Sequence, residues 1–100
     1  MVITILEAHV APDKAARLEA AYRQGIEHLD PGIVQTFLLR GVADSALWRI
    51  VTVWQSRAAL DEMRRSGSTP RGVLMFRAAD AEPALSVFDV VAQATASAMG

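Results

Sequence analysis

Residues 47–54, which read LWRIVTVW, constrain the fold of this chain more than any other segment. Because side chains alternate along a strand, Trp48 and Trp54 fall on one face, and the other face is mostly apolar as well. A sheet that is apolar on both faces must be covered on both sides. The helices predicted elsewhere in the chain can cover only one side. We therefore expect helices against one face of the sheet and a second copy of the sheet against the other.

Hydrophobic periodicity and turn residues predict four strands and three helices. Pro12 suits the first turn of a helix, and the sequence DPG at 30–32 is a stop signal. Ser56 is the expected N-cap of the second helix, and Thr69 is that of the third. The predicted strands cover residues 2–10, 33–40, 47–54 and 85–91, and the third helix covers about 70–79.

The connection at 41–45 is too short for a parallel crossover, so the sheet is expected to be antiparallel. The order β-α-β-β-α-α-β then predicts an α+β, ferredoxin-like domain with its helices on one face. Two such sheets packed face to face form a closed dimeric α/β barrel with an isologous interface. We assign the domain to residues 1–91 and treat residues 92–100 as a C-terminal tail, either frayed or an arm that reaches across the partner.

Two arginines stand on otherwise apolar strands. Arg40 and Arg49 are expected near strand ends or paired with acids, and Asp44 and Asp89 are the acids in reach. Arg49 is expected in the dimer interface. Within the strand over 33–40, alternation places three apolar side chains on one face: Ile33, Phe37 and Leu39.

The composition excludes several classes of protein. Hydrophobic residues make up 52% of the chain, above the usual ~45–50%, which favours a buried oligomer interface. The net charge of −1 gives no general attraction for nucleic acids or anionic membranes. The absence of cysteine excludes disulfides and thiolate chemistry. No apolar run approaches the ~18 residues of a membrane span, and the N-terminus lacks a basic leader, so a cytoplasmic protein is expected.

The two histidines give no metal signature. His9 and His28 lie nineteen positions apart on different elements, so no metal site is expected. His9 is the best titratable candidate, but alternation places it on the face away from the helices, together with Glu7. We interpret His9 as a structural or interface residue. His28 is expected in the last turn of the first helix, as a surface or capping residue.

Residues 51–60, VTVWQSRAAL, combine a strand end, a tryptophan, a polar residue, a serine and an amphipathic helix. In this pattern, and in the order and length of its elements, the chain resembles the antibiotic biosynthesis monooxygenase (ABM) family of dimeric ferredoxin-like barrels. The resemblance implies a ligand pocket between the helices and the helix-facing side of the sheet. The family includes cofactor-free oxygenases of phenolic polycyclic substrates, quinol oxygenases, heme-degrading enzymes and members without known chemistry.

The chain departs from the heme-degrading branch of that family. This branch uses an asparagine on the first strand, a tryptophan on the second helix and a histidine near the third. Ala8 and Met63 occupy the first two positions here, and no histidine follows His28. The resemblance therefore implies neither heme degradation nor a bound cofactor.

The cofactor-free oxygenase branch matches in part. Its tryptophan corresponds to Trp54, whereas Ile50 and Leu60 occupy its asparagine and tyrosine positions. An arginine of its third helix corresponds to Arg71 or Arg77. With Arg71 or Arg77 at its mouth, the expected pocket is lined by Trp48, Thr52, Trp54, Leu60, Met63, Leu74 and Phe76.

Each of these residues also has a structural interpretation. Trp48 and Trp54 are large hydrophobic side chains that would suit a packed core. The arginines of residues 57–77 outnumber the acids there by three, which suits either a cationic pocket rim or a solvated helix face.

The sequence leaves two main functions open, besides a third in which the chain is a subunit of a hetero-assembly with residues 92–100 as its arm. The first is a cofactor-independent monooxygenase that acts on a small hydrophobic phenolic or quinol compound. The second is a non-enzymatic small-molecule-binding or interaction module on the same dimeric scaffold. An open apolar cavity with an inward arginine or a perturbed titratable group would favour the enzyme, and a filled core would favour the module.

Overall fold

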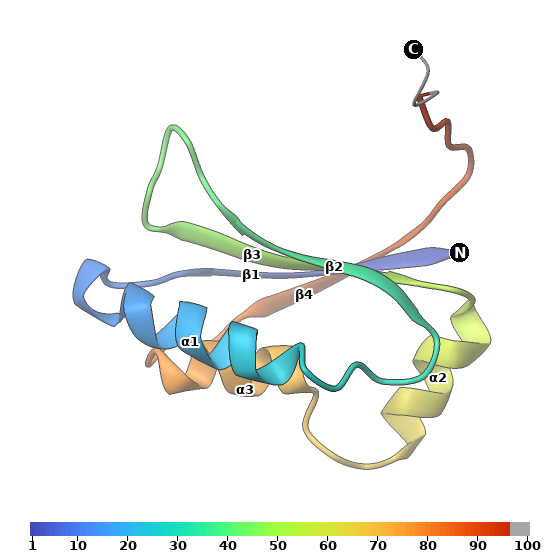
Figure 1. Ribbon diagram of the computed structural model, residues 1–100, viewed down its shortest axis with the longest axis horizontal. Helices are drawn as coiled ribbons and strands as arrows, with labels where there is room; N and C mark the ends of the chain where they lie inside the picture. Colours follow the sequence, from blue (N-terminus) through green and yellow to red (C-terminus); the bar gives the residue numbers. More distant parts are fainter. Residues whose placement is uncertain (97–100) are drawn as a thin grey trace.

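The computed structural model describes residues 1–96. Residues 97–100, the end of the predicted tail, lie outside the described residues. Within the described chain, no helix combines the length and apolar character needed to cross a bilayer. The elements are β1 (Val2–His9), the 3₁₀ helix η1 (Pro12–Lys14), α1 (Ala15–Gly25), β2 (Ile33–Arg40), β3 (Leu47–Trp54), α2 (Arg57–Arg65), α3 (Arg71–Ala78) and β4 (Ala84–Asp89) (Figure 1).

The four strands form one antiparallel sheet in the order β2-β3-β1-β4. The short connection after β2 makes a hairpin with β3, as its length predicted. All three α-helices lie against the same face of the sheet (Figure 1). The predicted α+β, ferredoxin-like class is therefore confirmed.

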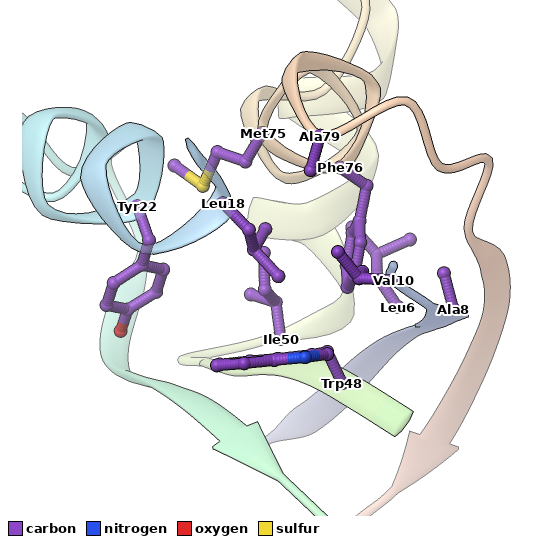
Figure 2. Packing of buried hydrophobic residues seen from close by; sticks show 10 residues of the cluster. All are labelled: Leu6, Ala8, Val10, Leu18, Tyr22, Trp48, Ile50, Met75, Phe76 and Ala79. Carbon is purple, nitrogen blue, oxygen red and sulfur yellow. The ribbon is translucent and has the colours of Figure 1, made fainter. Parts of the chain in front are cut away.

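The core fills the space between the helices and the sheet (Figure 2). Trp48 and Trp54 both face the helices and are buried, so they share one face of the sheet, as alternation predicted. Trp54 lies in a small cluster under α2 with Val2 and Leu60. Ten buried residues form the main cluster beneath α1 and α3, including Leu6, Leu18, Trp48, Ile50 and Phe76.

A β-bulge near the start of β2 changes which side chains face the helices. The register shifts after Ile33, and Val34 is the extra residue. Ile33 therefore turns toward the helices and packs against the Trp54 cluster. The side chain of Phe37, which is paired with Val51, still points away from the helices. The prediction that these strand residues share one face was wrong for Ile33, because strict alternation holds only where no residue is inserted.

The helix boundaries confirm one predicted cap and correct two other predictions. The Oγ of Ser56 accepts a hydrogen bond from the backbone N–H of Ala59 at 3.1 Å, so Ser56 caps α2. Thr69 does not cap α3, because the extended Pro70 takes the N-cap position itself. α1 ends at Gly25, a poor helix former, so His28 lies in the following loop and not in a helical turn.

The face of the sheet away from the helices is apolar and uncovered in the single chain. At its centre, Val51 pairs across the strands with Ile5 on one side and Phe37 on the other. Phe37 is 40% exposed, and Phe88 at the β4 edge is 53% exposed. We call this surface the open face.

The charged residues near the open face do not pair as predicted. Arg49 forms an ion pair with Glu7, its direct cross-strand neighbour, and not with an aspartate. Asp44 instead accepts a hydrogen bond from His9 at 2.9 Å, which lowers the pKa of the Asp44 carboxyl. Arg40 lies over the ring of Trp48, with its Cζ 5.7 Å from the ring centroid. Cross-strand register, which the sequence does not state, decides these partners.

Gly32→Ala is expected to lower the free energy of unfolding by roughly 3 kcal/mol. Gly32 has a φ of +91°, and an added Cβ would lie 2.5 Å from the Cβ of Ala59, which cannot move aside. Gly67→Ala is the matched control. Its φ is +76° but no atom lies within 4 Å of the added Cβ, so only about 1 kcal/mol of backbone strain is expected. Urea unfolding measures both, and equal losses would contradict the role of the Ala59 contact.

Candidate functional site

A cavity of about 80 Å³ lies between the sheet, α1 and the start of α3. It opens where the loop after α1 meets the first turn of α3. Apolar side chains predominate among its sixteen lining residues: Leu6, Tyr22, Gly25, Ile26, His28, Leu29, Asp30, Ile33, Thr36, Ile50, Thr52, Met63, Pro70, Arg71, Gly72 and Met75.

Two glycines let the helices approach closely enough to enclose this space. A Cβ on Gly72 would lie 2.6 Å from the Cδ1 of Leu6, so a larger residue there would push the end of the Leu6 side chain aside. A Cβ on Gly25 would overlap the terminal methyl of Met75, whose side chain fills the gap between α1 and α3. The flexible Met75 side chain therefore forms the part of the wall that can adjust to a ligand.

Hydroxyl groups mark one side of the cavity. The Tyr22 hydroxyl of α1 donates to the Oγ1 of Thr36 on β2, at 3.4 Å. Thr36 is paired across the strands with Thr52, and their hydroxyls also lie 3.4 Å apart. Thr4 continues the row on β1, but its hydroxyl already accepts a hydrogen bond from the Trp54 Nε1 at 3.1 Å. Tyr22, Thr36 and Thr52 therefore form a hydroxyl chain whose long bonds leave capacity for a ligand oxygen.

Arg71 stands at the mouth of the cavity. Its guanidinium donates to the backbone carbonyl of His28 and, at 3.5 Å, to that of Gly25. Its Nη2 lies 3.7 Å from the carboxylate of Asp30. These contacts fasten the start of α3 to the loop after α1. They hold a half-exposed positive charge at the entrance, which suits an anionic or strongly polarised oxygen.

The predicted pocket residues separate into two groups. Thr52, Met63 and Arg71 line the cavity. The other predicted residues do not line this cavity: Trp48 and Phe76 lie in the main core, Trp54 and Leu60 under α2, Leu74 half-exposed on the outside of α3, and Arg77 in the last turn of α3.

The choice between the two arginines depends on their neighbours. Arg77 makes two hydrogen bonds to the Glu82 carboxylate, at 3.0 and 2.8 Å. These bonds lower the pKa of Glu82 and raise that of Arg77. Arg77 is therefore engaged outside the cavity that we describe, and Arg71 is the guanidinium at its entrance.

Sequence reasoning missed Tyr22, Thr36 and Asp30 as cavity residues. Tyr22 combines an apolar ring with a hydrogen-bonding hydroxyl, so its residue type was the only signal that the sequence offered. Thr36 shares a cross-strand position with the predicted Thr52. That signal becomes readable only when the register of β2 against β3, including the bulge, is known.

His9 lies on the open face and not in the cavity, in agreement with its predicted direction. The described residues contain no group of three or more histidines and carboxylates that could hold a metal ion.

The sequence itself identifies the family. The profile of the family described as antibiotic biosynthesis monooxygenase matches residues 1–72, from β1 to the first turn of α3. The chain belongs to this family. The matched part of the ABM domain contains the three hydroxyl groups and Arg71. A search of curated proteins found no significant match.

Solved structures share the ABM fold over nearly the whole chain. A variant of MhuD, with two manganese protoporphyrin IX molecules bound per active site, has a TM-score of 0.72 and 20% identity over 96% of this chain and 100% of that one. A candidate ABM protein from Deinococcus radiodurans has a TM-score of 0.71 and 12% identity, with coverages of 97% and 99%. SnoaB, a cofactor-independent oxygenase from Streptomyces nogalater, has a TM-score of 0.68 and 19% identity, with coverages of 92% and 94%. At these identities the similarity establishes the fold alone.

Proposed function

We propose that this ABM protein is a cofactor-independent monooxygenase for a small hydrophobic phenol or quinol. The observation that carries the proposal is the cavity between α1, α3 and the sheet. It is mostly apolar, it has hydroxyl groups on one side, and it has a guanidinium at its mouth. An apolar space with a few converging polar groups is the usual form of a small-molecule site.

Such a reaction needs a substrate whose anion can reduce oxygen. Loss of the phenolic proton gives an electron-rich anion, which transfers electrons to O₂ and forms a carbon–oxygen bond at a ring carbon that carries hydrogen, ortho or para to the phenolic oxygen. The resulting hydroperoxide loses water, which leaves a carbonyl carrying one oxygen atom of O₂. A phenol and O₂ thus become a quinone and water. The protein's contribution is to orient the ring, exclude water and stabilise the anion.

The cavity residues supply these contributions. Thr36 and Thr52 offer hydrogen bonds that fix the position of a ligand oxygen. Arg71 supplies positive charge beside a developing phenolate. Asp30 and His28 are the proton-accepting side chains at the entrance, where the phenolic proton must leave.

The cavity does not fit the tetrapyrrole bound in the MhuD structure. Pockets for drug-sized ligands measure roughly 300–1,000 Å³, whereas this cavity measures about 80 Å³. No step of the proposed reaction therefore uses heme.

The same proposal includes a homodimer that forms through the open face. Figure 1 shows the β2–β3 hairpin and the segment after β4 extending from the sheet on the side away from the helices. Val42 on the hairpin is fully exposed and Val91 is 94% exposed, so both extensions offer apolar contacts to a partner. The Glu7–Arg49 pair would lie inside this interface, and Arg49→Ala would weaken the dimer.

Oxygen uptake tests the proposed reaction directly. Single-ring hydroquinones and phenols are presented to the dimer, O₂ consumption is followed with an electrode, and products are analysed by mass spectrometry under ¹⁸O₂. Incorporation of one labelled oxygen per product supports monooxygenation. A phenol that raises the melting temperature but causes no O₂ uptake binds without being converted to product. That result would instead support a ligand-binding module, the second function that this site can serve.

Arg71→Gln is expected to weaken binding of a phenolate by roughly tenfold, because it removes the positive charge at the entrance. Arg77→Gln is the matched control, since it removes an equal charge that is bonded to Glu82. Titration of tryptophan fluorescence measures both variants. Equal effects of the two substitutions would contradict a specific role for Arg71 and would point to general electrostatics.

A further inference from the structure

A groove between α1 and β2 adjoins the cavity and shares a wall with it. The groove has a volume of about 390 Å³, and Tyr22 and Ile26 line both spaces. Figure 2 shows the Tyr22 ring descending from α1 toward the sheet. The two spaces are therefore neighbouring chambers that are separated by side chains.

The hydrogen bond that fixes this wall is weak. The Tyr22 hydroxyl and the Thr36 Oγ1 are 3.4 Å apart, beyond the usual range of about 2.5–3.0 Å for such a bond. The ring is held mainly by packing, and it can give up this bond at little cost. A ligand longer than the cavity can therefore pass the edge of Tyr22 and enter the groove.

The groove carries an uncompensated guanidinium. Arg40 lies over Trp48 and forms no ion pair with a carboxylate among residues 1–96. The other arginine of the groove, Arg23, is bonded to Glu19 at 3.1 Å. Arg40 is thus the group that a carboxylate in this groove would meet, in a geometry that suits paired hydrogen bonds beside an aromatic floor.

The volumes indicate how a ligand would divide between the chambers. An engineered protein cavity of about 150 Å³ holds benzene, so a cavity of about 80 Å³ accepts one ring only with adjustment of Met75. The remainder of a larger ligand needs the groove. The groove is polar and is lined by Arg40, so it favours a ligand whose end in the groove is anionic.

We infer that the cavity and the groove form one elongated site for an aromatic phenol that carries a carboxylate at its far end. The phenolic ring occupies the cavity near Thr52, and the carboxylate binds Arg40. This inference rests on the cavity being a ligand site, as proposed above, but it does not require the site to be catalytic.

The test compares two probes with the same biphenyl skeleton, 4′-hydroxybiphenyl-4-carboxylate and neutral 4-hydroxybiphenyl, by tryptophan fluorescence and calorimetry. Arg40→Gln is expected to raise the dissociation constant of the acid about tenfold and to change that of the neutral probe by no more than about twofold. Thr52→Val is expected to weaken the binding of both probes by about threefold, because both probes place their phenol in the cavity. Arg17→Gln is the control: Arg17 lies on α1 but does not line the groove, so this substitution should change the binding of neither probe.

Three results would overturn the inference. The first is an acid probe that does not bind the wild-type chain. The second is an acid probe whose affinity is unchanged by Arg40→Gln. The third is an acid probe whose affinity is unchanged by Thr52→Val, because such a probe would bind in the groove alone. The predicted pattern of binding together with no O₂ uptake on any phenol would uphold the elongated site while refuting the proposed monooxygenase activity.

Discussion

Val51→Asp is expected to convert the proposed homodimer into a monomer. Val51 lies at the centre of the open face, between Ile5 and Phe37, where a partner sheet would exclude water. A carboxylate buried there without a partner costs several kcal/mol, and an isologous interface contains the substitution twice. The dissociation constant should rise at least ~100-fold. Sedimentation equilibrium or size-exclusion chromatography with light scattering measures it.

Ala20→Asp provides the control for added charge, because Ala20 is exposed on α1 in the helical layer. This variant should remain a dimer. If Val51→Asp also remained a dimer, the open face would not be the interface. If the unsubstituted chain were monomeric at micromolar concentration, the proposed homodimer itself would fail.

Phe76→Ala is expected to cause the largest loss of stability among the substitutions considered, about 3–5 kcal/mol. Phe76 is fully buried, and its ring packs in the main cluster beneath α1 and α3 (Figure 2). Its removal loses the transfer free energy of the ring and leaves a void that the rigid sheet cannot close. Small domains have total stabilities of about 5–15 kcal/mol, so the variant should unfold at far lower denaturant concentration.

Leu74→Ala is the control on the same helix. Leu74 is 51% exposed, so its truncation should cost no more than about 0.5 kcal/mol. Urea unfolding at one fixed protein concentration compares the two variants, because the stability of a dimer depends on concentration. Similar losses for both would contradict the assignment of Phe76 to the core and of Leu74 to the surface.

The pattern of the sequence was sufficient for the architecture. The period of two in residues 47–54 placed both tryptophans on one face of the strand, and the short connection at 41–45 required antiparallel strands. These features are local, because they depend on chain geometry within a few residues. The helix start at Ser56 was predictable for the same reason, since a cap is formed by a side chain and the N–H groups next to it.

The site was only partly predictable. Of the residues predicted to line a pocket, Thr52, Met63 and Arg71 lie beside the cavity, whereas Trp54, Leu60 and Phe76 lie in packed core. All of these residues lie on elements that were predicted to face one another. Which of them border empty space depends on the distances between helices and sheet, and these depend on close contacts such as that of Gly72 with Leu6.

By itself, the sequence determined the order of the elements, the antiparallel sheet, the helix-covered face and the family. Tertiary structure alone decided that the bulge at Val34 turns Ile33 inward, that Arg49 pairs with Glu7, and that Tyr22 separates a cavity from a groove. The physical reason is the range of the interactions. Periodicity and capping are set within a turn or a strand, whereas register, ion pairs and cavities are set by residues that are distant in the chain and meet only after folding.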